Sequence, residues 1–145
     1  MLLHQEPETY RDEACLIRVW YPAPGLHVAS AEGVLTDGGA SVIEASMMRA
    51  LDEGGSYLAF NDWEALVDYE LSARLRLTRT SARILRRMER VHILVRTRLV
   101  LLGIKMSNIV LQDKLTAYQS RAPFERALAE VLEGRGRGDL VKAPA

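Results

Sequence analysis

Hydrophobic and polar positions form alternating blocks along the chain, and these blocks predict strands and helices in turn. Runs rich in β-branched and aromatic residues, each closed by a turn or polar segment, predict strands at residues 14–21, 26–35, 56–61, 91–96 and 114–118. Apolar residues at helical spacing predict helices at residues 38–53, 72–90, 98–110 and 122–133. This order predicts an α/β fold: a single mixed, largely parallel sheet of about five strands flanked by helices.

The expected element boundaries rest on specific residues. Pro22 to Gly25 predicts the turn of a hairpin between the first two strands. Thr36, Ser72 and Thr97 are placed to cap the helices that follow them, and Gly54-Gly55 predicts the end of the first helix. The region from Asp62 to Glu70 is polar and predicts a turn before the second helix.

The chain of 145 residues has room for one domain. We expect a flexible N-terminal arm at residues 1–13, the α/β domain at 14–133 and a disordered C-terminal tail at 134–145. The longest uninterrupted apolar run, Leu99–Ile104, is too short to span a membrane, and the N-terminus lacks the pattern of a secretion signal. We therefore expect a cytoplasmic protein in which Cys15 stays reduced.

Charge is unevenly distributed along the chain although the formal net charge is zero. Residues 1–70 carry 3 basic and 13 acidic side chains, and residues 71–145 carry 16 basic and 6 acidic ones. Six arginines share one arc of the predicted second helix: Arg76, Arg79, Arg83, Arg86, Arg87 and Arg90. Such a stripe needs compensating anions, from this chain's own acidic half, a second copy, a partner protein, a phosphate backbone or a lipid head group.

Candidate chemistry is sparse. His4, His27 and His92 lie far apart with no ligand at metal-binding spacing, so we expect no metal site. The glycines match no phosphate-binding pattern, so we expect no cofactor. Asp62, Glu64 and Asp68 form an acidic cluster at the end of a strand, where α/β enzymes place their sites, but a solvated loop is the favoured explanation of the cluster.

Several segments together resemble one family. They are Ala31–Thr36 with the helix after it, Phe60–Trp63, the turn from Tyr69 to Arg74 into an arginine-rich helix, Glu89–Val95, and the stretch from Leu115 to Leu128. In this order they resemble the STAS-like superfamily, in the branch similar to the anti-sigma-factor antagonists. That branch carries a phosphorylated Ser or Thr in an Asp-Ser-Ser-Gly-like motif at a helix N-terminus. The chain lacks this motif, and Ser72 is the nearest equivalent.

The resemblance implies a non-catalytic signalling module that binds a protein partner, or a second copy, through the face around residues 60–90. The expected partner-binding residues on this face are Asp62, Trp63, Asp68, Ser72, Arg76, Arg79, Arg83 and Arg87, with Ser72 as a possible phosphoacceptor. Overall neutrality and the absence of aromatic residues from the arginine stripe disfavour nucleic acid.

Two alternatives remain open. The first is a carrier of lipid or another small apolar ligand, because the topology also resembles that of CRAL-TRIO domains and residues 99–109 have the composition to wall an apolar pocket. An enclosed cavity of a few hundred Å³ would favour the carrier. The second alternative is an enzyme that uses Asp62, Glu64 and Asp68, which would require these carboxylates to converge in a cleft.

Overall fold

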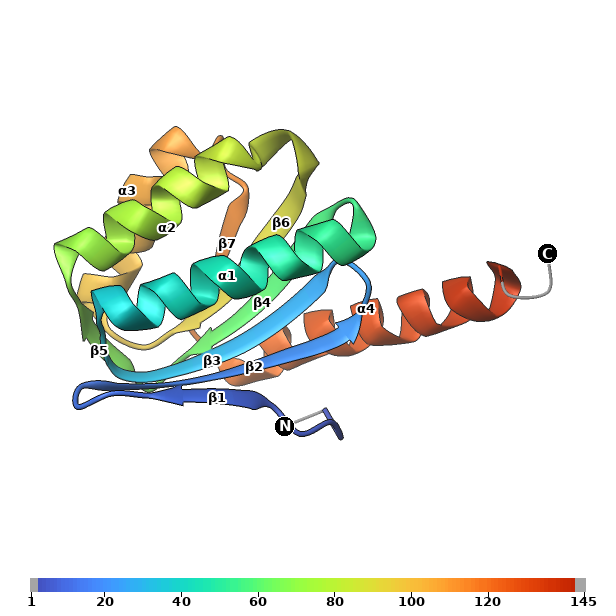
Figure 1. The fold of residues 1–145 in the computed structure, drawn as a ribbon, viewed down its shortest axis with the longest axis horizontal. Helices are drawn as coiled ribbons and strands as arrows, with labels where there is room; N and C mark the ends of the chain where they lie inside the picture. The colour runs from blue at the N-terminus through green and yellow to red at the C-terminus, as the bar shows by residue number, and fades with distance from the viewer. Residues whose placement is uncertain (1–2, 143–145) are drawn as a thin grey trace.

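In the computed structural model, which describes residues 3–142, a seven-stranded sheet is covered by helices on both faces (Figure 1). The strands are β1 (Glu8–Arg11), β2 (Cys15–Ala23), β3 (Leu26–Leu35), β4 (Tyr57–Trp63), β5 (Leu66–Tyr69), β6 (Met88–Val95) and β7 (Leu115–Tyr118). The helices are α1 (Asp37–Gly54), α2 (Leu71–Arg83), α3 (Arg98–Val110) and α4 (Arg121–Lys142), with one 3-10 turn, η1 (Leu85–Arg87).

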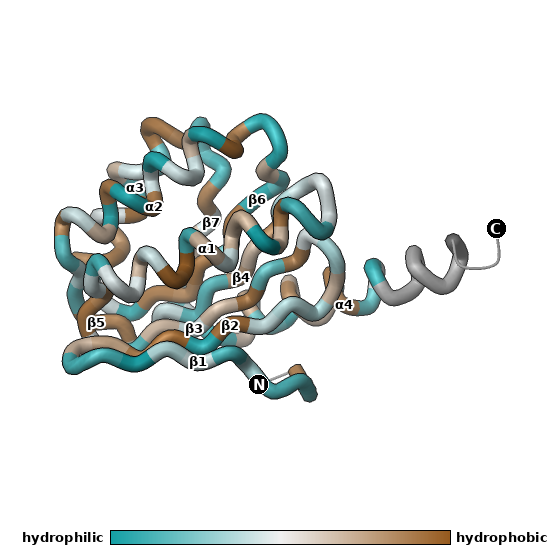
Figure 2. The backbone as a smooth tube through the Cα atoms, viewed as in Figure 1, coloured by the Kyte–Doolittle hydropathy of each residue, from teal (hydrophilic) through white to brown (hydrophobic). Residues whose placement is uncertain are grey.

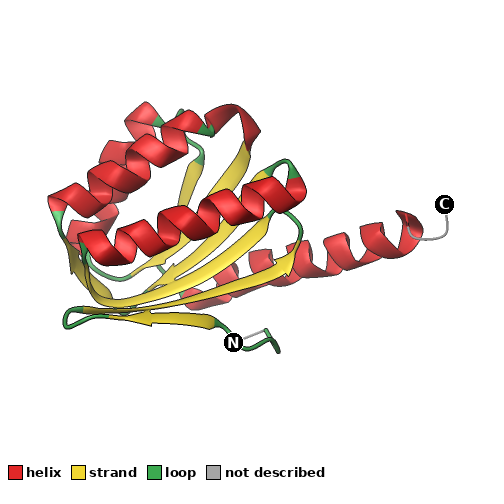
Figure 3. Cartoon of the chain, viewed as in Figure 1, coloured by secondary structure: helices red, strands yellow, loops and turns green. Residues whose placement is uncertain are grey.

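The sheet is mixed, as the sequence predicts, but has more strands than the expected five. Its order is β1-β2-β3-β4-β6-β7, and β5 pairs with the end of β3. The β1–β2 and β2–β3 pairs are antiparallel, and every other pair is parallel. Helices α1, α2 and α3 lie on one face of the sheet and α4 lies on the other (Figure 3).

Alternation along the central strands supplies two separate hydrophobic cores. In β3, Leu26 and Val28 belong to the core beneath α4, whereas Ala29 and Ala31 belong to the core beneath α1, α2 and α3. This division follows from the period of two in a strand, which sends successive side chains to opposite faces. The two cores therefore share one set of strands.

Local capping signals begin and end the helices as predicted in several places. The Thr36 hydroxyl accepts a hydrogen bond from the Gly39 amide at the start of α1, and the Thr97 hydroxyl accepts one from the Val100 amide at the start of α3. Gly55 ends α1 in the left-handed conformation with φ 74°, where a residue with a Cβ is strained.

The predicted helix over residues 72–90 is wrong in its second half. It ends at Arg83, and Met88 already begins β6 by pairing with Tyr57 of β4. Ile84, Met88 and Val91 are buried and lie at the helical spacing i, i+4, i+7, so their spacing favours a continuous helix. Residues 88–95 nevertheless form a strand, because they pair with β4.

The predicted polar turn at 62–70 is also wrong in part. Residues Leu66–Tyr69 form β5, which pairs with β3. Leu66 is buried while Val67 and Asp68 are exposed, and four residues are too few for the strand pattern to stand out from neighbouring charges.

The two terminal segments differ from expectation as well. Residues 8–11 of the expected flexible arm form β1, because Tyr10 packs against the core and the strand pairs with β2. Helix α4 continues past Gly134 to Lys142, and Arg135 forms an ion pair with Glu89. Glycine weakens a helix by about 1 kcal/mol without preventing its hydrogen bonds. The last part of the expected tail, residues 143–145, lies outside the described residues.

The edge strand β1 is hydrophilic along its length (Figure 2). A charged, short edge strand discourages pairing with another sheet. Among residues 3–142, no helix combines the length and the apolar character needed to cross a bilayer.

Candidate functional site

Adjacent residues at the end of β4 lie on opposite faces of the sheet. The Asp62 side chain, 12% exposed, forms an ion pair with Arg121 of α4 at 2.9 Å. Trp63 packs against the other core and lines a cavity beneath the helices. Asp62 and Trp63, which were predicted to bind one partner together, therefore lie on opposite sides of the sheet.

Asp62 lies in an open, polar groove of about 490 Å³ beside α4. Arg121 joins Asp62, Glu64 and Glu125 at 2.9, 3.1 and 3.2 Å. These carboxylates raise the pKa of the Arg121 guanidinium above its ordinary value, although its partial burial acts in the opposite direction. Asp68 does not line this groove: it is exposed on β5 and accepts a hydrogen bond from the Tyr69 amide. The three carboxylates of the predicted acidic cluster do not converge.

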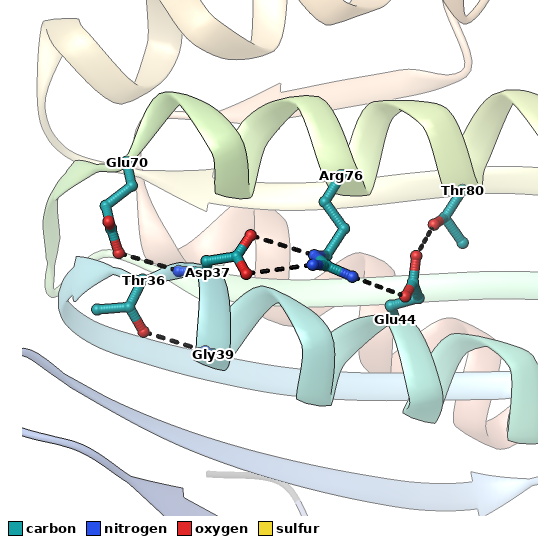
Figure 4. Close-up of polar contacts among 7 residues, drawn as sticks. All are labelled: Thr36, Asp37, Gly39, Glu44, Glu70, Arg76 and Thr80. Atoms are coloured by element: carbon teal, nitrogen blue, oxygen red, sulfur yellow. Dashed lines mark hydrogen bonds and ion pairs between the residues drawn. The ribbon is translucent and has the colours of Figure 1, made fainter.

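Arg76 joins α2 to α1 and is not a free surface cation (Figure 4). Its guanidinium contacts Asp37 at 3.1 Å and Glu44 at 3.4 Å, and these partners raise its pKa. Glu44 also accepts a hydrogen bond from Thr80, and Glu70 accepts one from the Asp37 amide. Acidic groups from the first half of the chain thus neutralise a basic group from the second half.

The other arginines of the predicted stripe do not share one helical face. Arg79 and Arg83 are exposed on α2, and Arg86 is exposed on η1. Arg87 donates to the Gly55 carbonyl oxygen at 3.0 Å, and Arg90, in β6, donates to Thr116 and to the Asp113 carbonyl oxygen. The expectation of six arginines on one helix is wrong because the helix ends at Arg83.

Ser72 is exposed as the second residue of α2. Glu70 occupies the N-cap position and makes no capping hydrogen bond with its side chain, so the expected cap at Ser72 is wrong. The first turn of α2 contains no acidic residue, and an anion at this position would interact favourably with the helix dipole. A phosphoacceptor role for Ser72 stays a prediction.

Helix α3 is apolar on both sides. Val100, Gly103 and Ile104 face the core, whereas five large apolar residues are exposed: Leu99, Leu102, Met106, Ile109 and Val110. Ile109 is 83% exposed and Leu102 is 55% exposed. We call these five residues the α3 apolar face. The spacing 99, 102, 106, 109 is visible in the sequence, and a helix with two apolar stripes is itself a sign of a second contact.

A cavity of about 80 Å³ lies between the sheet and the three helices on its face. It is lined mainly by apolar side chains from the core, including Met47, Leu66, Val91, Ile93 and Ile104. Two polar residues of β4, Asn61 and Trp63, also line it. Sequence reasoning missed this site, because residues 56–61 fit an ordinary buried strand.

Two side-chain atoms on the cavity lining are buried without a hydrogen-bond partner among the described residues. They are the Asn61 Oδ1 acceptor and the Trp63 Nε1 donor. A buried polar group without a partner costs about 1–3 kcal/mol, so such groups are rare in folded proteins. The pair therefore gives the cavity one acceptor and one donor that no described residue satisfies.

Buried hydrogen bonds join His27 of β3 to helix α1 and to the neighbouring strand β4. Ser46 donates to the Ile43 carbonyl oxygen and therefore accepts from His27 Nε2 at 2.7 Å, and Tyr57 donates to His27 Nδ1 at 2.9 Å. Burial lowers the pKa of His27 to about 3 and raises that of Tyr57. This group resembles a Ser-His pair, but His27 is fully buried and neutral, so its role is structural.

Comparison with solved structures identifies the fold. The chain is similar to an anti-sigma factor antagonist from Mycobacterium paratuberculosis, with 14% identity and a TM-score of 0.56 over 79% of this chain and 93% of that one. It is also similar to a protein of the DUF3478 family from Shewanella loihica, described as having a SpoIIAA-like fold, with 14% identity and a TM-score of 0.57 over 88% of this chain and 98% of that one.

These similarities confirm the predicted fold: the chain shares the SpoIIAA-like fold of these two structures. No protein-family model matches the chain, and no curated protein matches it in sequence.

Proposed function

We propose that the chain is a non-catalytic, cytoplasmic protein-interaction module whose partner is an acidic protein that docks on the α3 apolar face. The observation that carries this proposal is the exposure of five large apolar residues on a helix whose opposite side is already packed in the core. Exposed apolar residues gathered on one element mark interaction surfaces in soluble proteins.

Charge favours an acidic partner. Helices α2 and α3 contain no acidic residue, and they carry exposed basic side chains that include Arg79, Arg83, Arg98 and Lys105. An apolar centre with charged surroundings is the usual anatomy of a protein interface. Negative groups on the partner would steer association and fix its orientation.

The likeness in fold agrees with a protein partner. One of the similar structures is an anti-sigma factor antagonist, which by its description acts against another protein. This chain lacks the Asp-Ser-Ser-Gly-like motif, and the arginines expected at the interface are partly engaged within the chain. We therefore centre the docking surface on α3, with Arg79 and Arg83 at its side, and leave out Asp62, Trp63 and Arg76.

The carrier and enzyme alternatives have less support. The cavity of about 80 Å³ is below the few hundred Å³ expected of a lipid carrier. Asp62 and Glu64 are both bound to Arg121, and Asp68 lies outside the groove that they line.

The test compares the wild-type chain with the double variant Leu102→Glu, Ile109→Glu. Both positions are exposed, so the variant should fold with an unchanged circular dichroism spectrum. Wild-type chain immobilised in a lysate of its native cells should retain an acidic protein that the variant does not retain. With the purified partner, the variant should bind at least 100-fold more weakly, because two apolar anchors are replaced by charges that repel an acidic surface.

Arg126→Glu is the matched control, since Arg126 is exposed on α4 on the other face of the sheet. It should bind as the wild-type chain does. Equal retention by wild type and the double variant would contradict the proposal. So would flotation of the wild-type chain with anionic vesicles, or sedimentation as a dimer that the double variant abolishes, because these results assign the α3 apolar face to a membrane or to a second copy.

A further inference from the structure

We propose that the cavity beneath α2 binds a small uncharged organic molecule with an apolar body and a head group that both donates and accepts a hydrogen bond, such as a primary amide or an alcohol. This site is separate from the α3 apolar face. The cavity lies between the sheet and the helices that cover it, whereas the docking surface is formed by the outward side chains of α3.

The cavity exists because α2 turns few large side chains toward the sheet. The buried residues of this helix are Ala73, Thr80 and Ser81, and of these Ser81 lines the cavity. Helix α1 supplies Ile43 and Met47 to the lining and α3 supplies Val100 and Ile104, whereas α2 supplies one large apolar side chain, Leu77, beside Thr78 and Ser81. The sequence of α2 thus leaves space that its neighbours do not fill.

Two unpartnered atoms define the polar end of the site. Asn61 is 5% exposed, and its Oδ1 has no donor among the described residues; Trp63 Nε1 has no acceptor there. Both side chains belong to β4 and are two residues apart, so both leave the sheet on the same face. A hydroxyl or primary amide can accept from the indole and donate to the carboxamide at the same time.

The remainder of the lining favours an uncharged ligand. Among the described residues that line the cavity, Arg74 is the single charged one. Its guanidinium lies over the Tyr69 ring at 5.8 Å and donates to Met106 Sδ at 3.4 Å. Arg74 is half-buried and Met106 is exposed, so the guanidinium lies at the rim of the cavity and not at its centre. A charge placed at the apolar centre would have no counterion there and would lose its hydration.

The seam between α2 and α3 is the path to the cavity. Tyr69, Arg74 and Ser107 line the cavity and are half-buried. A Cβ at Gly103 would lie 2.7 Å from the Tyr69 hydroxyl, so the glycine is what allows this ring to lie against α3. The Thr78–Ser107 hydrogen bond of 2.9 Å joins the two helices beside it.

The experiment follows the indole N–H signals of the chain by 1H–15N NMR while propanamide is added. The two tryptophans give two signals, and a Trp63→Phe variant assigns them. Trp20 is an internal control, because its Nε1 donates to the Gln5 carbonyl oxygen beneath the opposite face of the sheet. We expect the Trp63 signal to shift saturably and the Trp20 signal to stay in place.

Propanoate, which has nearly the same shape and a negative charge at pH 7, is the matched ligand control and should bind at least 10-fold more weakly than propanamide. Equal binding of propanoate would overturn the proposal by assigning the site to an anion at Arg74. A Trp63 signal that does not saturate up to 100 mM propanamide or 1-propanol would overturn it as well, since the space would then hold water alone.

Asn61→Leu is the matched variant, because leucine has the same branched shape as asparagine and removes the acceptor. It should reduce propanamide affinity at least 10-fold without lowering the melting temperature. Unchanged affinity would show that Asn61 does not select the ligand and would overturn the proposed head-group chemistry. None of these measurements involves a protein partner, so a failure here is distinct from a failure of the proposed function.

Discussion

The buried imidazole of His27 should make the stability of the fold depend on pH. Its two nitrogens are hydrogen-bonded to Ser46 and Tyr57, and burial lowers its pKa from 6.5 to about 3. The unfolded chain binds a proton at this residue near pH 6.5, while the folded chain does not bind it until about pH 3. The stabilisation is therefore complete above pH 6.5 and is lost as the pH falls toward 3.

We predict that the free energy of unfolding falls between pH 6.5 and 4.5 and that His27→Gln reduces this slope. Glutamine retains one donor and one acceptor but has no titratable group. The slope should decrease by up to about 1.4 kcal/mol per pH unit, the value for one proton. Urea denaturation at a series of pH values measures it.

Part of the slope should remain in the His27→Gln variant, because burial also lowers the pKa of His92, to about 4. Asp12, whose pKa is held below its ordinary value of 3.8 by hydrogen bonds from Thr36, Ala14 and Cys15, loses its contribution only below this pH range. Equal slopes in the wild type and the His27→Gln variant would contradict the assignment.

At the residue scale, the sequence indicates which side of a strand a residue faces but not whether its polar atoms find partners. The alternation of Leu26 and Val28 against Ala29 and Ala31 was predictable from the period of two. The unpartnered atoms of Asn61 and Trp63 depend on how much space α2 leaves above β4. That distance arises from packing among elements far apart in the sequence.

At the scale of the element, boundaries set by local chemistry were predictable and boundaries set by pairing were not. Thr36, Thr97 and Gly55 form their caps within four residues of chain, so the sequence is sufficient to locate them. The end of α2 and the start of β6 depend on the pairing of Met88 with Tyr57, 31 positions away in the sequence. Because the predicted helix ran on to residue 90, it placed Arg86, Arg87 and Arg90 on the same helix as Arg76, whereas they lie on η1 and β6.

Comparing Arg76 with Arg79 tests whether the ion pairs between α1 and α2 stabilise the fold. Arg76 holds α2 to α1 through Asp37 and Glu44, whereas Arg79 is exposed one turn further along the helix. We predict that Arg76→Gln lowers the melting temperature and that Arg79→Gln does not, as measured by circular dichroism. Because the Arg76 pairs are partly exposed, the decrease should shrink as salt is added.

Glu44→Gln serves as the partner variant, since it removes one of the two anions bound by Arg76. In combination with Arg76→Gln, its effect should be less than additive. Equal melting temperatures for Arg76→Gln and Arg79→Gln would show that the α1–α2 ion pairs do not stabilise the fold.

At the scale of the whole molecule, one sheet connects two cores of different composition. The core beneath α4 includes an aromatic group in which Phe60 stacks on His92 at 4.3 Å and Phe124 contacts both Phe60 and Tyr118 edge-on. The core on the other side contains the cavity. Because β3, β4 and β6 contribute to both, neither core can lose its order without exposing the strands of the other.

We predict that Phe124→Ala lowers the free energy of unfolding by about 3–5 kcal/mol and that both cores unfold together. Phe124 is 2% exposed on α4, and its loss leaves a cavity against Phe60. Trp20 reports on the core beneath α4, and Trp63 reports on the other core. In variants that keep one tryptophan each, urea unfolding followed by fluorescence should give coincident transitions, both with and without Phe124→Ala. Separate transitions, with Trp20 released before Trp63, would show that α4 and its core form an independent unit on a sheet that stays folded without it.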